Sequence, residues 1–250
     1  MSRLPTTPTE SPQVDELDAA ADRVDTVRAS TLRDVLEQSF SPLNVTILLR
    51  QQAASPTLPR LPVVGLPEDS MAHRAGMITK RDIRLLTLGY LQLHPGEVLW
   101  DIGAGSGSVS IEAAQMASDG SVYAIEMDAE EHGLIRENAE RFGVANVNAI
   151  LGRAPEAFDE LPDPDAVFIA GAGREVIRLT EAAYARLRRG GRLVVNTKSI
   201  DHLSELRQML SQHSSHIHIW MINLSRGTDQ LDRLTFEPLK PSFLLAVTKS

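Results

Sequence analysis

The sequence predicts an α/β protein whose core is a mostly parallel, seven-stranded sheet with an antiparallel hairpin at its C-terminal end. Three observations support this fold class. Short apolar segments alternate with amphipathic ones from residue 98 to residue 210, and strands that alternate with helices form parallel sheets. A glycine-rich turn joins the first strand directly to a helix. The last two apolar segments, Ile217–Leu224 and Phe243–Thr248, have no helix between them, which predicts an antiparallel pair.

Length and composition favour one main domain and exclude several classes of function. The chain has 250 residues, 42% of them apolar, which is enough to bury one sizeable core. Its net charge of −8 argues against a general electrostatic grip on nucleic acid. The absence of cysteine excludes disulfides, thiol nucleophiles and cysteine-held metals. No run approaches the roughly 20 apolar residues of a membrane span, and no signal-peptide pattern opens the chain, so we expect a cytoplasmic enzyme without a membrane partner.

The first 64 residues are expected to form an extension in front of the main domain. Residues 1–13 carry three prolines among polar residues, which predicts a disordered tail. Apolar spacing over residues 14–36 predicts two short helices, and residues 40–49 are rich in β-forming side chains. Four prolines from Pro56 to Pro67 then indicate a linker. The expected boundaries are 1–13 for the tail, 14–64 for the extension and 65–250 for the main domain.

The main domain is expected to begin with a helix and to continue as a series of strands and helices. Thr79-Lys-Arg-Asp82 has the residue types of a capping box, so we expect a helix from Lys80 to about Leu91. Pro95-Gly96 predicts a turn before the first strand. The later elements follow from the length and spacing of their apolar runs. Strands are expected at residues 98–102, 122–126, 146–151, 166–170 and 192–196, and helices at 111–116, 129–142, 175–187 and 202–210.

The segment Asp101-Ile-Gly-Ala-Gly-Ser-Gly107 follows the first strand, at the sheet edge where parallel α/β proteins bind ligands. Its glycines remove side chains where a ligand must contact the backbone, and the next helix offers free amides. A dinucleotide fingerprint would need glycine where the chain has Ser108. The pattern instead resembles the first motif of class I S-adenosylmethionine (SAM) methyltransferases, which have a Rossmann-like fold; a purely structural turn is the alternative. The resemblance assigns to the cofactor Asp101, Gly103, Ala104, Gly105, Ser106 and Gly107.

An acidic residue ends the second strand. Glu126 lies 19 residues after Gly107, where a carboxylate can accept hydrogen bonds from both ribose hydroxyls; an ordinary solvated carboxylate is the alternative. Met127 offers a soft apolar surface to an adenine ring, with plain packing as an equal alternative. After the third strand, related enzymes carry a polar residue for the adenine amine, so Arg153 and Ala154 are cofactor candidates, although Arg153 departs from the usual acid. The glycine loop and Glu126 together indicate SAM.

The corner after the fourth strand, Ile169-Ala-Gly-Ala-Gly-Arg174, is small and glycine-rich. It lacks the Asn/Asp-Pro-Pro-aromatic motif that many adenine and amino-group methyltransferases carry at this place. Small residues leave room for a large substrate, and Arg174 can bind an anionic group; a loop that only starts a helix is the alternative. We therefore assign Ala170 to the cofactor and Gly171, Arg174 and Asn196 to the substrate.

Five segments form a more specific set: Met77–Arg84, Leu99–Ala114, Val122–Glu126, Pro162–Ile169 and Gly190–Asn196. Together they resemble the CbiT-type precorrin methyltransferases of cobalamin (vitamin B12) biosynthesis, over about Gly65 to Lys249. The resemblance implies methylation of a meso carbon of a precorrin, a tetrapyrrole macrocycle, with loss of carbon dioxide from an acetate side chain. It also implies a homo-oligomer, often a tetramer, and places Thr79 with the cofactor. Ser39–Val45 resembles the end of a partner methyltransferase that is fused to many members, so a separate partner enzyme is expected here.

The implied substrate carries many carboxylates, so basic side chains are expected to gather at the pocket mouth of this net acidic chain. Two or three of the candidates should serve, and Arg84, Arg174 and Arg226 are assigned to the substrate. All the candidates are Arg74, Lys80, Arg81, Arg84, Arg174, Lys198 and Arg226. No metal site is expected, because His213, His216 and His218 have no third ligand at convincing spacing. No catalytic acid or base is identified.

Two departures from the family pattern leave the substrate open. Ala170 and Ala172 interrupt a corner that is usually all glycine, and a charged stretch follows Ser225–Gln230 where the family is glycine-rich. The alternatives are another class I methyltransferase, acting on tRNA or protein, and a non-catalytic SAM-binding scaffold. The net acidic charge and the missing Asn-Pro-Pro motif count against tRNA.

Overall fold

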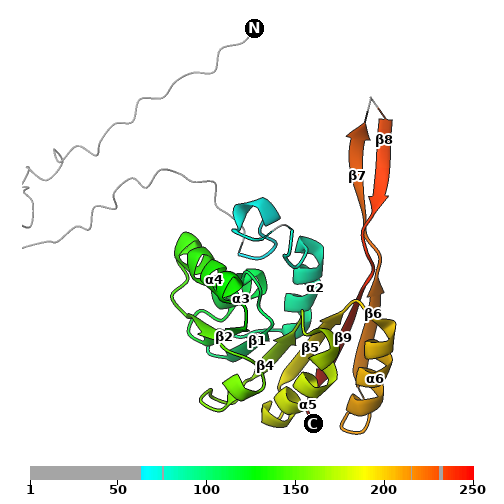
Figure 1. Ribbon diagram of the computed structural model, residues 1–250. Coiled ribbons are helices and arrows are strands. Elements are labelled where there is room, and N and C mark those ends of the chain that lie inside the picture. The colour runs from blue at the N-terminus through cyan, green and yellow to red at the C-terminus, as the bar shows by residue number, and fades with distance from the viewer. Residues whose placement is uncertain (1–62, 75, 215, 231–232) are drawn as a thin grey trace, which may run out of the picture. The chain divides into compact units, whose positions relative to one another are not determined.

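A seven-stranded sheet forms the centre of the protein (Figure 1). The computed structural model describes residues 63–74, 76–214, 216–230 and 233–250. The expected tail, the two short helices and the β-rich segment lie within residues 1–62, outside the described residues. In order across the sheet, the strands are β3 (Val147–Leu151), β2 (Ser121–Glu126), β1 (Val98–Ile102), β4 (Ala166–Ile169), β5 (Arg192–Thr197), β9 (Ser242–Thr248) and β6 (Ile217–Ile222).

The strand directions confirm the predicted fold class. β1 pairs in parallel with β2 and β4, and the parallel pairing continues to β3 on one side and β5 on the other. β9 runs antiparallel to both β5 and β6. The predicted antiparallel pair near the C-terminus is therefore confirmed as β6 and β9. Because β9 runs in the opposite direction, its first residues lie at the same sheet edge as the last residues of β5.

Helices cover both faces of the sheet, and successive residues of β1 face opposite sides. Leu99 packs with α2 and α3, whereas Trp100 packs with α5 and α6. Coverage on both sides explains why β1 is an apolar, almost fully buried strand. The helices are α2 (Arg81–Leu91), α3 (Ser108–Met116), α4 (Ala129–Phe142), α5 (Val176–Arg186) and α6 (Ile200–Leu210), with short 3₁₀ turns η1 (Glu68–Ser70), η2 (Glu156–Phe158) and η3 (Gly173–Glu175). No helix among the described residues is long and apolar enough to cross a membrane.

The start of α2 differs from the prediction. Lys80 is the N-cap residue, and its side chain makes no capping hydrogen bond. The free amide of Arg81 is instead bound by the Glu68 side chain, with 3.3 Å between N and Oε1. The capping box at Thr79–Asp82 is therefore wrong, because Thr79 lies one residue too early and a residue distant in sequence supplies the carboxylate.

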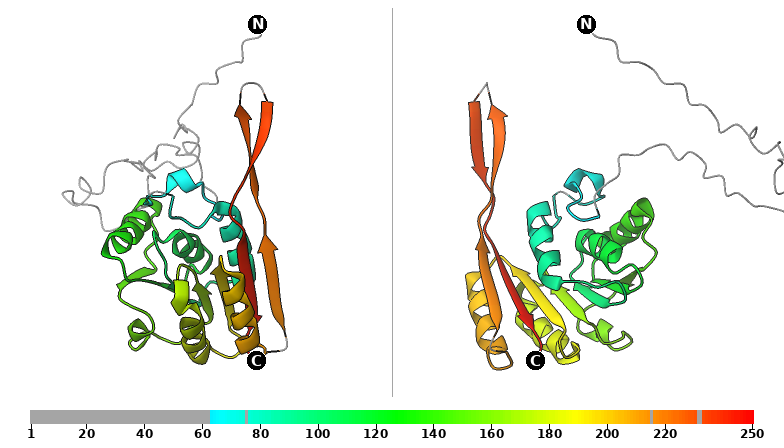
Figure 2. Two further views of the ribbon diagram at one scale, coloured as in Figure 1. Left: turned by 45° about the vertical axis from the view of Figure 1, so that its right-hand side comes forward. Right: turned by 180° about the vertical axis from the view of Figure 1, so that it is seen from behind.

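Two strands were not predicted. β7 (Ser225–Gln230) and β8 (Arg233–Pro238) follow β6 and precede β9 in the sequence. They form an antiparallel ribbon that projects beyond the sheet (Figures 1 and 2). We call this ribbon the arm. Strands are predicted from an alternation of apolar and polar residues, which arises when one face of the strand is buried. The residues of β8 are all exposed, so the arm lacks a sustained alternation of this kind. Among them, Leu234 and Phe236 are each 65% exposed.

Candidate functional site

A cavity of about 1100 Å³ opens at the carboxyl ends of the parallel strands. Its walls come from the loop after β1, the ends of β2 to β5, the segment before α2 and the residues just before β9. Parallel sheets place ligand sites at this edge. Pockets for one small molecule usually measure about 300–1,000 Å³. The cavity therefore lies just above the usual range for one small molecule.

The glycine loop lines this cavity. At Gly103 (φ +73°) a side chain would stand 2.1 Å from the Ala170 carbonyl oxygen, so only glycine lets the loops after β1 and β4 approach this closely. Gly105 (φ +55°) has more space, since a Cβ there would meet only Glu131 Oε2 at 3.9 Å. Four residues of the predicted cofactor set line the cavity here: Gly103, Ala104, Gly105 and Ser106.

Asp101 and Gly107 lie behind the loop and do not line the cavity. Asp101 is fully buried and accepts a hydrogen bond from Ser110 Oγ at 2.5 Å, while its Oδ1 has no donor within the described residues. Burial raises the pKa of Asp101 to about 7, although the bond from Ser110 opposes this, and the charge of Glu126 adds to the rise. Gly107 is the left-handed N-cap of α3, which begins three residues before its predicted start. The structure therefore does not support direct cofactor contact for either residue, since both lie behind the loop.

Glu126 is held at the edge of the cavity by backbone amides. Its Oε2 accepts the Gly105 N–H at 2.9 Å, and its Oε1 accepts the N–H groups of Met127 and Asp128 at 2.8 and 2.9 Å. The carboxylate thus joins the glycine loop to the start of α4, and its two oxygens retain acceptor capacity for hydroxyl groups. Met127 lines the cavity with an exposed side chain, so it is not part of the core.

Six further predicted cofactor and substrate positions line the cavity. Its lining includes Thr79, Arg153, Ala154, Ala170, Gly171 and Asn196. Asn196, near the end of β5, accepts a hydrogen bond from Ser242 Oγ at 2.5 Å, which ties β5 to the start of β9. From Ala170 to Gly173, the corner after β4 lines the cavity with alanine and glycine alone, and these small residues take up little of its volume.

Of the predicted basic candidates, only Arg74, Lys80 and Lys198 line the cavity. Arg84 is fully buried instead, with its Nε 2.8 Å from Glu112 Oε1. The prediction that Arg84 lies at the pocket mouth is wrong, because its charge is paired inside the protein, where it also binds the Thr79 carbonyl.

Three further basic candidates, Arg81, Arg174 and Arg226, are exposed and lie outside the cavity lining, so substrate contact is not supported for Arg174 or Arg226. The sequence analysis missed Lys240, which lines the cavity as Lys198 does. The sequence did contain a signal for Lys240, because this residue precedes a strand that was expected to be antiparallel. An antiparallel strand begins at the sheet edge where the parallel strands end, which is the edge of the cavity.

The histidines near the C-terminal strands make packing contacts. His218 stacks on Trp220 with ring centroids 5.5 Å apart, and His213 lies 5.6 Å from the ring of Tyr184. Within the residues that the structure describes, no three His, Cys, Asp or Glu side chains are grouped as metal ligands.

Comparison with known proteins shows that the chain is similar to precorrin methyltransferases. A sequence model of the precorrin methyltransferase domain matches residues 70–249. A decarboxylating precorrin-6Y C(5,15)-methyltransferase of Sinorhizobium sp. is 43% identical over 162 residues, 64% of this chain and 38% of that protein. A probable decarboxylating cobalt-precorrin-6B C(15)-methyltransferase of Pyrobaculum calidifontis is 34% identical over 184 residues, 72% of this chain and 94% of that one.

A solved structure supports the same relationship. The precorrin-6Y C5,15-methyltransferase from Geobacter metallireducens superimposes with a TM-score of 0.71 at 35% identity, over 75% of this chain and all of that one. The chain therefore spans little more than a third of the Sinorhizobium relative, but nearly the whole of the Pyrobaculum relative.

Proposed function

The chain belongs to the precorrin methyltransferase domain family, and on that premise we propose that it transfers a methyl group from SAM to a meso carbon of a precorrin and removes carbon dioxide from an acetate side chain. The observation that carries the proposal is the cavity of about 1100 Å³, with the glycine loop and Glu126 on one side and the small corner after β4 on the other. A cavity that is larger than usual for one small molecule supports a site that a cofactor and a substrate share.

The residues at the glycine loop fit SAM. Gly103 lets the loops after β1 and β4 approach closely, and Gly105 leaves open space beside the backbone, where a Cβ would meet only Glu131 Oε2 at 3.9 Å. Glu126 is already oriented by three amides and can accept hydrogen bonds from ribose hydroxyls without rearranging. When bound, SAM supplies an electrophilic methyl group. The contribution of the chain is to align the reacting carbon with that methyl group and to exclude water.

Charge is distributed unevenly around the cavity, which supports an anionic substrate on one side. Of the four lining carboxylates, Glu126, Asp128 and Glu131 belong to the end of β2 and the start of α4, and Glu175 lies in η3 after β4. Two lining lysines lie at another part of the wall: Lys198 directly follows β5, and Lys240 comes shortly before β9. We assign these two lysines to carboxylates of the macrocycle, since ion pairs to carboxylates are among the stronger hydrogen bonds.

The macrocycle supplies the electron pair for the new carbon–carbon bond, while the methyl–sulfur bond breaks with its electron pair on sulfur and S-adenosylhomocysteine would leave. Its conjugated system accepts the pair that is released when the acetate group loses carbon dioxide, and a proton replaces the lost group. No side chain is assigned as the general base.

A homo-oligomer is also part of the proposal, with the arm as the contact. Leu234 and Phe236 expose large apolar side chains on β8, and a two-stranded ribbon by itself is marginally stable in water. Contact with another copy of the chain would cover both side chains and stabilise the ribbon.

The proposed reaction is tested by mass spectrometry of a precorrin-6Y-type tetrapyrrole after incubation with the full chain and methyl-labelled SAM. We expect the gain of one labelled methyl group together with the loss of carbon dioxide. Methyl gain alone would assign decarboxylation to another enzyme. No change, in a preparation that binds the cofactor product S-adenosylhomocysteine (SAH), would contradict the precorrin substrate and favour a tRNA, a protein or a non-catalytic scaffold.

The same assay tests the lysine assignment. Lys198→Ala and Lys240→Ala should each raise the KM for the tetrapyrrole by about tenfold, the value of one charge-assisted hydrogen bond, with a smaller change in kcat. Arg189→Ala is the matched control, because Arg189 is exposed and remote from the cavity lining. Equal effects of all three changes would argue against the assignment.

A further inference from the structure

One buried carboxylate beside the glycine loop accepts no hydrogen bond among the described residues and has only an ion pair with Arg74. Glu131, in the first turn of α4, lines the cavity and is only 5% exposed. Neither of its carboxylate oxygens accepts a hydrogen bond within the part of the chain that the structure covers. Burial raises the pKa of Glu131, although the charge of Arg74 opposes the rise. Buried polar groups in proteins are normally hydrogen-bonded, so this carboxylate indicates a partner that the chain does not itself supply.

The surroundings of Glu131 are strongly acidic. Arg74 Nε lies 3.2 Å from Glu131 Oε1, close enough for an ion pair. The same guanidinium also lies 2.7 Å from Glu130 and 3.6 Å from Asp128, so one positive charge is shared among three carboxylates. The charge of Glu126 acts on Glu131 as well. This corner of the cavity therefore favours a positively charged ligand group.

The position of Glu131 relates it to the glycine loop. Its Oε2 lies 3.9 Å from the place where a Cβ on Gly105 would stand. The amide of Gly105 is bound by Glu126, the residue that we assign to the ribose. Glu131 is therefore a neighbour of the glycine loop, next to which the part of SAM beyond the ribose would lie. That part ends in an α-amino acid, which carries an ammonium group.

We propose that Glu131 accepts the α-ammonium group of SAM and that Arg74 holds the Glu131 carboxylate in position. The assignment rests on the proposed use of SAM and deepens it, because it names the residue that selects ligands with an intact amino-acid end. A hydrogen bond from the ammonium group would satisfy a buried carboxylate that the chain provides with an ion pair but with no hydrogen bond.

The test compares two ligands that differ only in that end. SAH retains the amino acid, and 5′-methylthioadenosine retains the adenine, the ribose and the sulfur but lacks it. Calorimetric titration of the full chain should show tighter binding of SAH. Glu131→Gln is expected to weaken SAH binding by about tenfold or more, the value of one charge-assisted hydrogen bond, and to change methylthioadenosine binding by less than about twofold.

Glu130→Gln is the matched control. Glu130 belongs to the same turn of α4 and pairs with the same guanidinium, but it is exposed and does not line the cavity. It should leave the affinity for both ligands unchanged. Arg74→Met should reduce SAH affinity selectively, as Glu131→Gln does, and provides a second route if Glu131→Gln does not fold.

Each result separates the possibilities. Unchanged SAH binding in Glu131→Gln, or an equal loss for both ligands, would overturn the proposal in favour of a structural role. An equal effect of Glu130→Gln would attribute the loss to the ion-pair cluster and would also overturn it. Failure of the unaltered chain to bind either ligand would contradict the use of SAM itself.

Discussion

Asp101 illustrates how burial changes the chemistry of a single side chain. Its carboxyl group is enclosed in β1, with one hydrogen bond from Ser110 and a pKa of about 7. An exposed aspartate has a pKa near 3.9. Between these two values the folded protein holds a proton that the unfolded chain has lost, so the free energy of unfolding falls as the pH rises through this window.

We therefore expect Asp101→Asn to reduce the dependence of stability on pH. In the unaltered protein, Asp101 should lower the free energy of unfolding by on the order of a few kcal/mol as the pH rises from about 4 to about 7. Asparagine does not titrate, so the variant should lack this dependence of the free energy of unfolding on pH. Denaturant unfolding at several pH values across the window measures it. Asp119→Asn, at an exposed position, is the control and should keep the original slope. Identical slopes in Asp101→Asn and the unaltered protein would show that Asp101 is ionised throughout.

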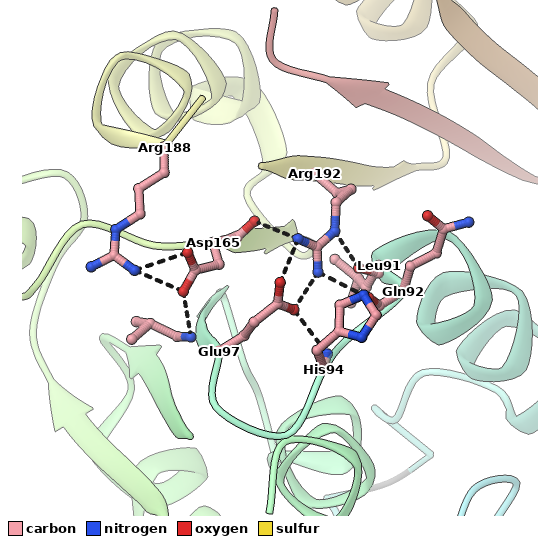
Figure 3. Close-up of polar contacts among 8 residues, drawn as sticks. Leu91, Gln92, His94, Glu97, Asp165, Arg188 and Arg192 are labelled. Atoms are coloured by element: carbon pink, nitrogen blue, oxygen red, sulfur yellow. Dashed lines mark hydrogen bonds and ion pairs between the residues drawn. The ribbon is translucent and has the colours of Figure 1, made fainter. Parts of the chain in front are cut away.

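At the scale of secondary-structure elements, Arg192 joins four segments at the sheet edge opposite the cavity (Figure 3). Its guanidinium donates to the carbonyl oxygens of Leu91 at 2.8 Å and Gln92 at 3.0 Å, at the end of α2. It also binds Glu97 Oε1 at 2.8 Å, just before β1, and the Asp165 carbonyl at 3.3 Å, just before β4. One side chain at the start of β5 therefore fixes how these elements meet.

Arg192→Met should lower the free energy of unfolding by about 2–4 kcal/mol, because it leaves Glu97 and several carbonyl groups without their partner. The side chains of Arg192 and Glu97, which form an ion pair, are only 13% and 19% exposed. Arg178→Met is the control: its ion pairs with Glu156 and Glu175 are on the surface, so the change should cost less than about 1 kcal/mol. Denaturant unfolding of both variants is the measurement, and similar small losses would show that the Arg192 contacts add little.

The same variant should alter the response to acid. Burial works against ionisation of Glu97, but the hydrogen bonds from Arg192 and the His94 amide, with the charge of Arg192, keep the pKa of Glu97 below its ordinary value. This stabilisation is present above the ordinary glutamate pKa and is lost as the pH falls through the lower, folded-state pKa. Arg192→Met should therefore lose less stability on acidification than the unaltered protein does.

At the scale of the whole molecule, the arm is the feature that the isolated fold explains least. Its exposed Leu234 and Phe236 predict self-association, so Leu234→Glu combined with Phe236→Glu should give a smaller particle in light scattering. Leu86→Glu, at an exposed position on α2, should leave the particle size unchanged. Retained SAH binding would show that the double variant is folded. An unchanged mass would exclude the arm as the contact.

The sequence by itself determined the order of strands and helices apart from β7 and β8, the antiparallel pair near the C-terminus and the family. These features are encoded locally: apolar spacing specifies each element, and alternating strands and helices specify a parallel sheet. The glycine loop and Glu126 were recognisable for the same reason, since their spacing follows from a strand, a turn and a helix. The start of α2 was not, because its amide is bound by Glu68 from another segment.

Only the tertiary structure decided which charged side chains face the cavity. Arg84 had the residue type and the position of a substrate ligand, yet Glu112 on another helix pairs with it in the interior. Lys240 reaches the cavity because β9 runs antiparallel to β5, and Glu131 is identified only by its burial and by the absence of hydrogen bonds to it among the described residues. Burial and pairing depend on contacts between residues far apart in the chain, and apolar spacing and motif patterns carry no record of those contacts.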